Sequence, residues 1–196
     1  MLKDFFGFWA KQNHITTGSN LIRRNVIEKA GYQLADLRIS QDLEYWGYLA
    51  TFGKWGFIPV PLFVSDGTAV AAAQNWMSKY HTRRKLCPTV EQWERRIMSR
   101  LPEKDLPAFN IVRGRIAAIF SHSKILAGND LQARKIVQEY GELFPSGIIT
   151  KIMCIGNKLG RAGGKIACKF LKLREYTKAS LMGLTNRSLK YYHRKE

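Results

Sequence analysis

The spacing of hydrophobic residues divides the chain into a mixed first part and a helical remainder. Segment 15–24 has the pattern of a loop that leads into a short strand. Segment 55–64 has that of an edge strand, because its two prolines lack a backbone donor. Between them, capping and stop signals predict one helix that Asn25 caps and Gly31 ends, and a second helix over 41–52. We therefore expect residues 1–75 to be α/β, with a few strands in a sheet and two short helices against it.

Capping residues and breakers mark the helix ends. Capping-box patterns occur at Asn25 with Glu28 and at Thr89 with Gln92. Two later helices are separated by the short sequence AGND, a connection that favours an antiparallel hairpin. We expect residues 76–146 to form an all-α helical extension that contains this hairpin.

The clearest periodicity lies in residues 147–174. Apolar residues recur there at intervals of three, four or seven, and basic residues fall largely between them, which predicts a basic amphipathic helix. Such a helix suits an anionic membrane surface, although its apolar face could equally pack on the neighbouring hairpin. With its tail it makes a third expected unit, 147–196. The basic residues assigned to the membrane surface are Lys151, Lys158, Arg161, Lys165, Lys169 and Lys172.

Charge separates the first third of the chain from the rest. Residues 1–70 hold seven Lys/Arg and six Asp/Glu, a net of +1, whereas the remaining residues hold 25 and nine, a net of +16. A surplus of this size favours a polyanionic partner, either nucleic acid or an anionic membrane. The hydrophobic content of 45% indicates a globular protein.

Other sequence features indicate a cytoplasmic protein. No apolar run approaches the ~20 residues of a transmembrane helix, and the first residues lack a signal-peptide pattern. The three cysteines are widely spaced, which favours reduced structural thiols. The four histidines show no spacing typical of metal ligands, so we predict no metal site.

The block ITTGSNLIRRNVIEKAGYQLADLRISQDLEYWGYLATFGKWGFIPVPLF contains an ordered set of short motifs. They are Gly18-Ser19, Arg23-Arg24, Gly31, Gln41-Asp42, Trp46, Leu49 and Gly53-Lys54. In this order and spacing they resemble the second, acceptor-side half of the catalytic domain in inverting family-2 glycosyltransferases. The resemblance covers about a quarter of the chain and implies a partial GT-A (Rossmann-like) fold.

The resemblance implies a catalytic role for Asp42. Inverting glycosyl transfer needs a base that takes the proton of the acceptor hydroxyl, and Asp42 would supply it. Residues Gly18, Ser19, Asn20, Gln41 and Trp46 would lie at the acceptor site. From the residues alone, Asp42 could equally be an ordinary first-turn helix residue, Trp46 a core residue and Gly18 part of a plain turn.

Several features of the family pattern are missing. An acidic residue usually precedes the catalytic Asp, where this chain has Gln41. The nucleotide-binding half, with its Asp-x-Asp metal site, is expected before residue 1, and no Asp-x-Asp occurs in the sequence. We therefore expect no cofactor to be bound by this chain alone. Mg²⁺ or Mn²⁺ is implied for the complete enzyme.

These observations lead to one main functional hypothesis and one alternative. The chain would belong to a glycosyltransferase that moves a sugar from a nucleotide-sugar donor to a glycan or lipid-linked acceptor, as in bacterial surface polysaccharide synthesis. It would be cytoplasmic, at the inner membrane face. The alternative is a non-enzymatic protein that binds nucleic acid or a membrane surface, supported by basic clusters such as HTRRK and WERR.

Overall fold

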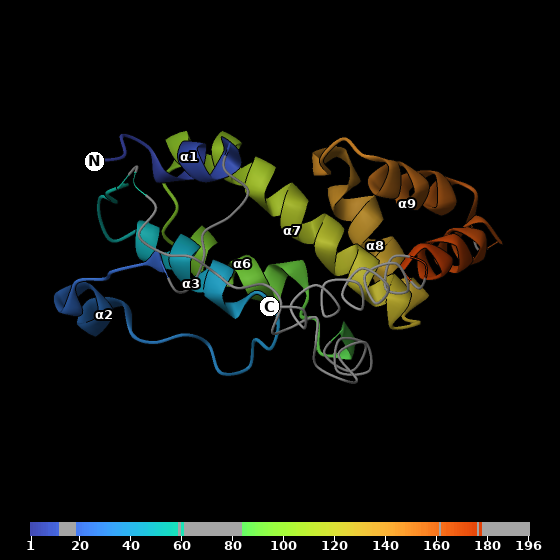
Figure 1. Cartoon of the computed structure of the whole chain (residues 1–196), viewed down its shortest axis with the longest axis horizontal. Coiled ribbons are helices and arrows are strands. Elements are labelled where there is room, and N and C mark those ends of the chain that lie inside the picture. The colour runs from blue at the N-terminus through green and yellow to red at the C-terminus, as the bar shows by residue number, and fades with distance from the viewer. Residues whose placement is uncertain (12–18, 59, 61–83, 161, 176, 178–196) are drawn as a thin grey trace, which may run out of the picture.

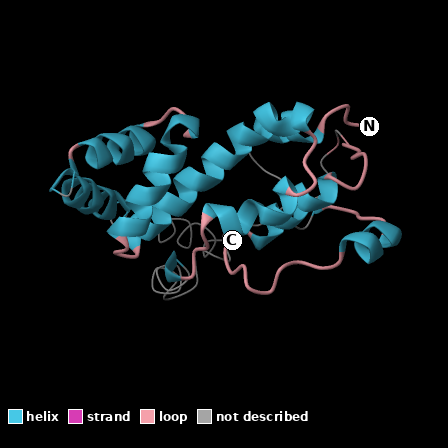
Figure 2. Cartoon of the chain, turned by 180° about the vertical axis from the view of Figure 1, so that it is seen from behind, coloured by secondary structure: helices cyan, strands magenta, loops and turns pink. Residues whose placement is uncertain are grey.

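The computed structural model describes residues 1–11, 19–58, 60, 84–160, 162–175 and 177. These residues form helices joined by loops (Figures 1 and 2). Two short 3₁₀ helices, Glu103–Asp105 (η2) and Gly141–Leu143 (η3), accompany the α-helices, and one more helix covers 162–175. The labelled α-helices are α1 Phe5–Lys11, α2 Arg24–Ala30, α3 Gln41–Ala50, α6 Val90–Met98, α7 Leu106–Leu126, α8 Asp130–Tyr140 and α9 Ile148–Lys158.

The prediction of an α/β fold is wrong, because the described residues are all-α and contain no strand. Leu2 N donates to Trp55 O at 2.7 Å, yet no ladder continues from this bond within the described residues. The apolar side chains expected in strands, such as Ile22 and Trp55, pack against helices instead. The described residues therefore contain no partial GT-A sheet, and parts of both predicted strands lie outside them.

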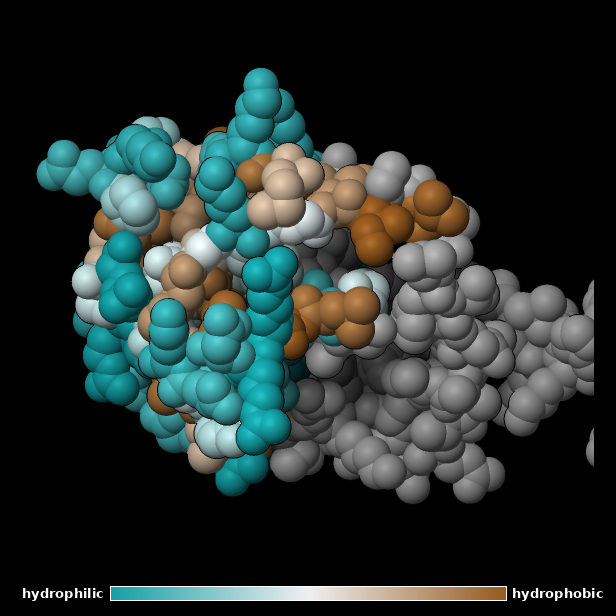
Figure 3. Space-filling view, turned by 90° about the vertical axis from the view of Figure 1, so that its left-hand side faces the viewer, coloured by the Kyte–Doolittle hydropathy of each residue, from teal (hydrophilic) through white to brown (hydrophobic). Residues whose placement is uncertain are grey.

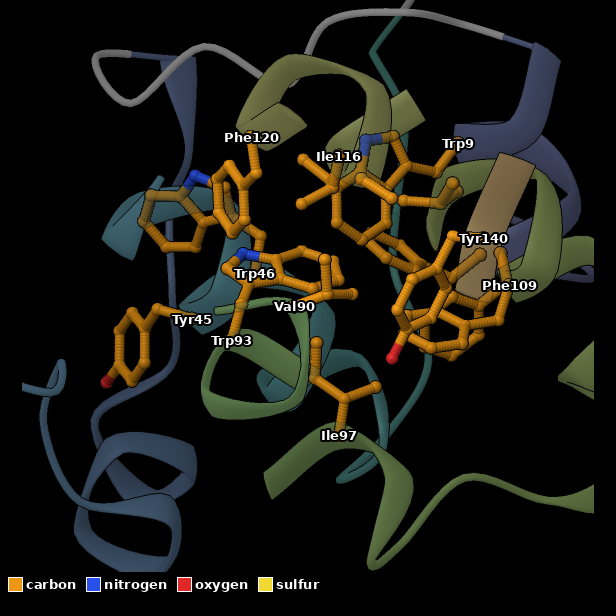
Figure 4. Close-up of a cluster of buried hydrophobic side chains, with 14 of the residues drawn as sticks. Trp9, Tyr45, Trp46, Val90, Trp93, Ile97, Phe109, Ile116, Phe120 and Tyr140 are labelled. Carbon is orange, nitrogen blue, oxygen red and sulfur yellow. The ribbon is translucent and has the colours of Figure 1, made fainter. Parts of the chain in front are cut away.

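Most of the large buried hydrophobic side chains lie in one core, which we call the aromatic cluster. It lies between α1, α3, α6 and the first part of α7, and α8 adds Ile136 and Tyr140 (Figure 4). Trp93 and Phe109 stack in parallel with ring centroids 6.0 Å apart. Trp9 contacts Trp93 with centroids 6.4 Å apart, which joins α1 to α6. The buried members are Phe5, Phe6, Trp9, Tyr45, Trp46, Leu49, Cys87, Val90, Trp93, Ile97, Phe109, Val112, Ile116, Ala117, Phe120, Ile136 and Tyr140.

A second core, the aliphatic cluster, occupies the opposite end of the molecule. The last part of α7, α8, α9 and helix 162–175 surround it, and α7 runs from one cluster to the other (Figure 1). No aromatic ring is among its buried members. They are Ala118, Ile125, Ala133, Val137, Met153, Cys168 and Leu171.

Several predicted helix ends are confirmed, one capping box is wrong, and α3 ends at Ala50 rather than at the predicted residue 52. The Thr89–Gln92 capping box forms, with both reciprocal hydrogen bonds present. The α7–α8 hairpin forms around the AGND turn, where the Asn129 side chain accepts from the backbone of α8. The Asn25–Glu28 box does not form. Helix α2 begins at Arg24, so Asn25 lies inside its first turn rather than at its cap, and the carboxylate of Glu28 pairs with Arg24 across one turn at 2.9 Å.

The single helix predicted over 147–174 is two helices. Helix α9 ends at Lys158, and the next helix runs over 162–175. Gly160 lies between them with φ of +70°, a left-handed conformation that glycine adopts without steric cost. The two helices lie side by side at one end of the molecule (Figure 1). None of the helices in the described part of the chain is long and apolar enough to cross a bilayer.

Candidate functional site

The start of α3 is the first candidate site, because the sequence places Gln41 and Asp42 there. Ser40 precedes the helix in a left-handed conformation, with φ of +57° and ψ of +24°. This conformation is unfavourable for a residue with a side chain, and it is fixed from two sides. Its carbonyl accepts from Trp93 Nε1 at 3.1 Å and from Glu44 N at 3.0 Å. The aromatic cluster therefore holds the backbone turn that leads into α3.

Gln41 and Asp42 lie half-buried in the first turn of α3. Leu43 N donates to Asp42 Oδ1 at 2.9 Å, which holds the carboxylate against the helix end. The helix dipole at this end favours a negative charge. The carboxylate is thus oriented and partly accessible to solvent, as a proton acceptor must be.

Trp46 lies one turn after Asp42 and is buried, with 4% of its surface exposed. Its ring packs on Tyr45, with centroids 5.6 Å apart (Figure 4), and on Trp55, with centroids 6.5 Å apart. Its Nε1 has no hydrogen-bond acceptor among the described residues. Trp46 therefore anchors α3 in the aromatic cluster. A direct contact between its ring and an acceptor sugar stays a prediction.

The remaining predicted acceptor residues lie just before α2. Ser19 is exposed and Asn20 is half-buried, and both contact other groups. Gly18 lies outside the described residues. Tyr45 Oη donates to Gly31 O at 2.8 Å, which ties the end of α2 to α3. At the end of the molecule that carries the N-terminus and α2, the described surface residues are mainly hydrophilic, with exposed hydrophobic groups among them (Figure 3).

A buried ion pair that involves Glu44, two residues after Asp42, was not predicted from the sequence. Glu44 is fully buried, and both of its carboxylate oxygens accept from Arg96, at 2.9 Å and 2.6 Å. Arg96 also donates to Tyr32 O at 3.1 Å and stacks over the Tyr48 ring at 4.3 Å. The pair fastens α3 to α6. The sequence signal for this ion pair is the position of Glu44, an acidic residue between the apolar residues Leu43 and Tyr45 of the helix.

The basic residues of the C-terminal hairpin form the second candidate site. Lys151, Lys158, Lys165 and Lys169 are exposed, Lys172 is partly exposed, and Arg161 lies outside the described residues. Six large apolar residues of this segment are exposed as well, so they do not pack on the neighbouring hairpin, which was one of the two predicted alternatives. This set comprises Ile148, Ile155, Leu159, Ile166, Phe170 and Leu173, and each has between 50% and 69% of its surface accessible.

A hollow of about 350 Å³ lies where the α7–α8 turn meets helix 162–175. Arg134 and Lys165 line it beside Asp130, one of whose carboxylate oxygens is buried without a partner in the described structure. Arg134 is already engaged, because it donates to Asn157 Oδ1 at 3.3 Å. No residue of α3 lines this hollow, so it is separate from Asp42.

The other buried ionisable groups are poorly suited to catalysis. Burial raises the pKa of the Cys87 thiol to about 11, although the nearby Lys124 ammonium opposes that rise. This thiol is therefore protonated at neutral pH and a weak nucleophile. Lys124 is buried and donates to Cys87 O. Among the described residues, no three His, Cys, Asp or Glu side chains gather as metal ligands would.

Comparison with known proteins adds no relative of established function. No family model, no curated protein and no solved structure matches this chain.

Proposed function

We propose that the chain contributes the acceptor side of an inverting glycosyl transfer, with Asp42 as the general base. The observation that carries the proposal is the turn before α3. Ser40 is held in a left-handed conformation, and strained backbone of this kind concentrates at functional sites. The strain lies two residues before the carboxylate that the sequence motif marks. The proposal relies on α3 and its supports, and it requires no sheet in the described residues.

The reaction defines what Asp42 must do. The acceptor hydroxyl oxygen attacks the anomeric carbon of the donor sugar while the bond from that carbon to the nucleotide phosphate breaks. The hydroxyl proton passes to the Asp42 carboxylate, and the electron pair of the broken bond leaves with the nucleotide. A carboxylate suffices as base because the hydroxyl becomes strongly acidic as the new bond forms. Mg²⁺ or Mn²⁺ would assist the leaving phosphate at the donor site, to which this chain's described residues offer no ligand cluster.

Rigid support of α3 suits this role, since a general base has to stay within hydrogen-bond reach of the substrate. Trp46 packs under the helix, Tyr45 binds the end of α2, and the Glu44–Arg96 pair fastens the helix to α6. Together these contacts hold the first turn of α3 in one orientation relative to the aromatic cluster.

The nucleic-acid alternative has less support. Its sequence evidence was the clusters HTRRK and WERR, and an arginine of each is engaged inside the protein. Arg84 is buried, with its guanidinium 3.7 Å from the Glu175 carboxylate. Arg96 binds Glu44 in the bidentate pair described above. These side chains are therefore not available to contact phosphates.

The test uses the chain together with a donor-binding half, nucleotide-sugar donors and Mn²⁺, and it measures transfer to a glycan acceptor. Asp42→Asn should lower turnover by about 10²–10⁴-fold with unchanged circular dichroism. Asp36→Asn is the matched control, because Asp36 is an exposed carboxylate in the loop before α3. It should leave turnover unchanged. Near-normal turnover of Asp42→Asn would return Asp42 to a purely structural role.

A second measurement examines the isolated chain. Isothermal titration with UDP-, GDP- and dTDP-sugars in the presence of Mn²⁺ should show no tight binding, because the described residues hold no cluster of metal ligands. Micromolar affinity for any of these donors would contradict the proposal that the donor binds outside this chain.

A further inference from the structure

Between its two helices the C-terminal hairpin buries small residues, while six of its large apolar residues are exposed. Gly156 and Gly163 are buried where α9 meets helix 162–175. A Cβ added at Gly156 would lie 2.7 Å from the Ala167 Cβ and 3.1 Å from Gly163 O. The two backbones therefore approach closely, and no room remains between them for a branched side chain. The larger residues of both helices point elsewhere.

The apolar line of α9 faces away from the aliphatic cluster. At about 100° per residue, Ile148, Ile155 and Leu159 fall along one line of the helix. Gly156 faces the partner helix, and Met153 is buried in the aliphatic cluster. Around the axis of α9, Gly156 lies between the apolar line and Met153. The line is thus on the outer side of the hairpin.

Helix 162–175 repeats this arrangement. Ile166, Phe170 and Leu173 form its exposed apolar line. Ala167, which faces α9, lies between this line and Leu171 in the aliphatic cluster. Because the helices are antiparallel neighbours, the two lines lie next to each other on one outer face.

Lysines border this face on both sides. In α9, Lys151 and Lys158 follow the apolar line on the side away from the partner helix. In helix 162–175, Lys165, Lys169 and Lys172 lie beside the apolar line on the side away from α9. The result is an apolar strip two helices wide with a lysine border along each edge. No Asp or Glu occurs between residues 145 and 174.

We propose that this outer face of the hairpin, formed by the exposed residues of α9 and helix 162–175, docks onto an anionic lipid bilayer. The hairpin would lie flat, with its six large apolar side chains in the acyl boundary and its lysines against the headgroups. Charge complementarity selects the partner, because every charged residue on the face is basic and a bilayer with anionic lipids supplies the opposite charge. The proposal stands independently of glycosyl transfer.

Two other occupants fit less well. A second copy of the chain would bring a face bordered entirely by lysines against an identical one, which like-charge repulsion opposes. Nucleic acid would match the lysines, but it would leave the apolar strip between them without a suitable contact. A bilayer interface satisfies both components at once.

The test is co-sedimentation of the full chain with phosphatidylcholine vesicles and with vesicles that also contain phosphatidylglycerol. Binding should occur on the anionic vesicles alone and weaken as NaCl is raised. Ile155→Ser with Ile166→Ser should lower the partition coefficient by about tenfold or more. The matched control is Ile111→Ser with Ile119→Ser, since those two isoleucines of α7 are 54% and 50% exposed. This control should bind as the unmodified chain does.

A lysine pair tests the electrostatic part. Lys165→Gln with Lys169→Gln should lower binding at low salt by about 10- to 30-fold, since each basic residue near an anionic surface contributes about fivefold. Lys54→Gln with Lys104→Gln removes the same charge from exposed positions outside the hairpin and should have little effect. Circular dichroism and melting temperature verify that each variant is folded.

Three results would overturn the proposal. One is the absence of binding to anionic vesicles. Another is equal binding to both vesicle types, which would remove the role of the lysines. The third is a dimer, seen by sedimentation velocity, that the isoleucine pair dissociates while vesicles remain unbound. That outcome would assign the face to a second copy of the chain.

Discussion

The two ends of the molecule place their large hydrophobic residues on opposite sides of their helices. In the aromatic cluster, rings from α1, α3, α6 and α7 fill the interior, and Trp93 and Phe109 are completely buried. In the hairpin of α9 and helix 162–175, glycines and alanine fill the contact, and the isoleucines remain at the surface. The first arrangement maximises burial on folding. The second forgoes that burial, so its exposed residues call for an explanation outside the fold.

Stability should therefore respond very differently to truncation at the two ends. Trp93→Ala removes a fully buried ring that also donates to Ser40 O, and it should lower the free energy of unfolding by about 3–5 kcal/mol. Ile155→Ala should change it by less than about 0.5 kcal/mol, because that side chain is already exposed. Urea denaturation of both variants measures the contrast. Comparable losses would show that the hairpin face is packed in solution.

The buried ion pair sharpens the comparison within the aromatic end. Arg96→Met leaves the fully buried Glu44 carboxylate without its partner, and the free energy of unfolding should fall by about 3 kcal/mol. Arg24→Met breaks an exposed pair with Glu28 and should cost less than about 1 kcal/mol. Thermal unfolding of the two variants tests the difference. An equal effect would mean that Glu44 is hydrated.

His122, at the aliphatic end, should make the stability depend on pH below neutrality. Burial lowers the pKa of His122 in α7 to about 4, and Arg84 and Arg174 act in the same direction while Glu175 opposes them. Between pH 6.5 and 4 the unfolded imidazole binds a proton and the folded one does not. The free energy of unfolding should therefore fall by about 3 kcal/mol as pH drops through this range, and be flat above it.

Urea denaturation across this pH range measures the loss, and His122→Gln is the control. The variant should show a flatter profile, because the imidazole that titrates only in the unfolded chain is gone. An unchanged profile would assign the pH dependence to other groups.

The smallest predicted effect concerns the glycine contact. In an isolated helix, Gly→Ala stabilises by roughly 0.5–1 kcal/mol. Gly156→Ala should destabilise by about 1 kcal/mol instead, because the new methyl group meets Ala167 and Gly163. Gly164→Ala is the matched control, since its nearest neighbour, Arg134 Cδ, is 3.9 Å away. It should show the ordinary stabilisation, and melting temperatures distinguish the two signs.

Short-range sequence patterns predicted local structure correctly more often than they predicted the fold. The Thr89–Gln92 box, the Gly31 stop and the α7–α8 hairpin depend on neighbouring residues, and all three are confirmed. The α/β prediction required strands to find partners distant in sequence. Apolar runs such as 55–58 look the same whether they join a sheet or cover a helix, so their pattern could not decide.

The candidate site shows the same division. The sequence located Asp42 at the start of a helix, which the structure confirms. The left-handed Ser40 and its bond to Trp93 join residues 53 positions apart, and no local pattern predicts such a contact. In the hairpin the apolar repeat was recognised but assigned to one continuous helix, because an i, i+4 repeat continues in register across the turn at Gly160.

The uneven distribution of rings has a spectroscopic consequence. Four of the five tryptophans, Trp9, Trp46, Trp55 and Trp93, lie in or against the aromatic cluster, and no tryptophan follows residue 93. The fluorescence of these four therefore observes one end of the molecule, while far-ultraviolet circular dichroism observes the helices of both. Coincident denaturation curves from the two signals would show that α7 couples the clusters into one cooperative unit. Separated curves would give the midpoint of each end in a single unlabelled sample.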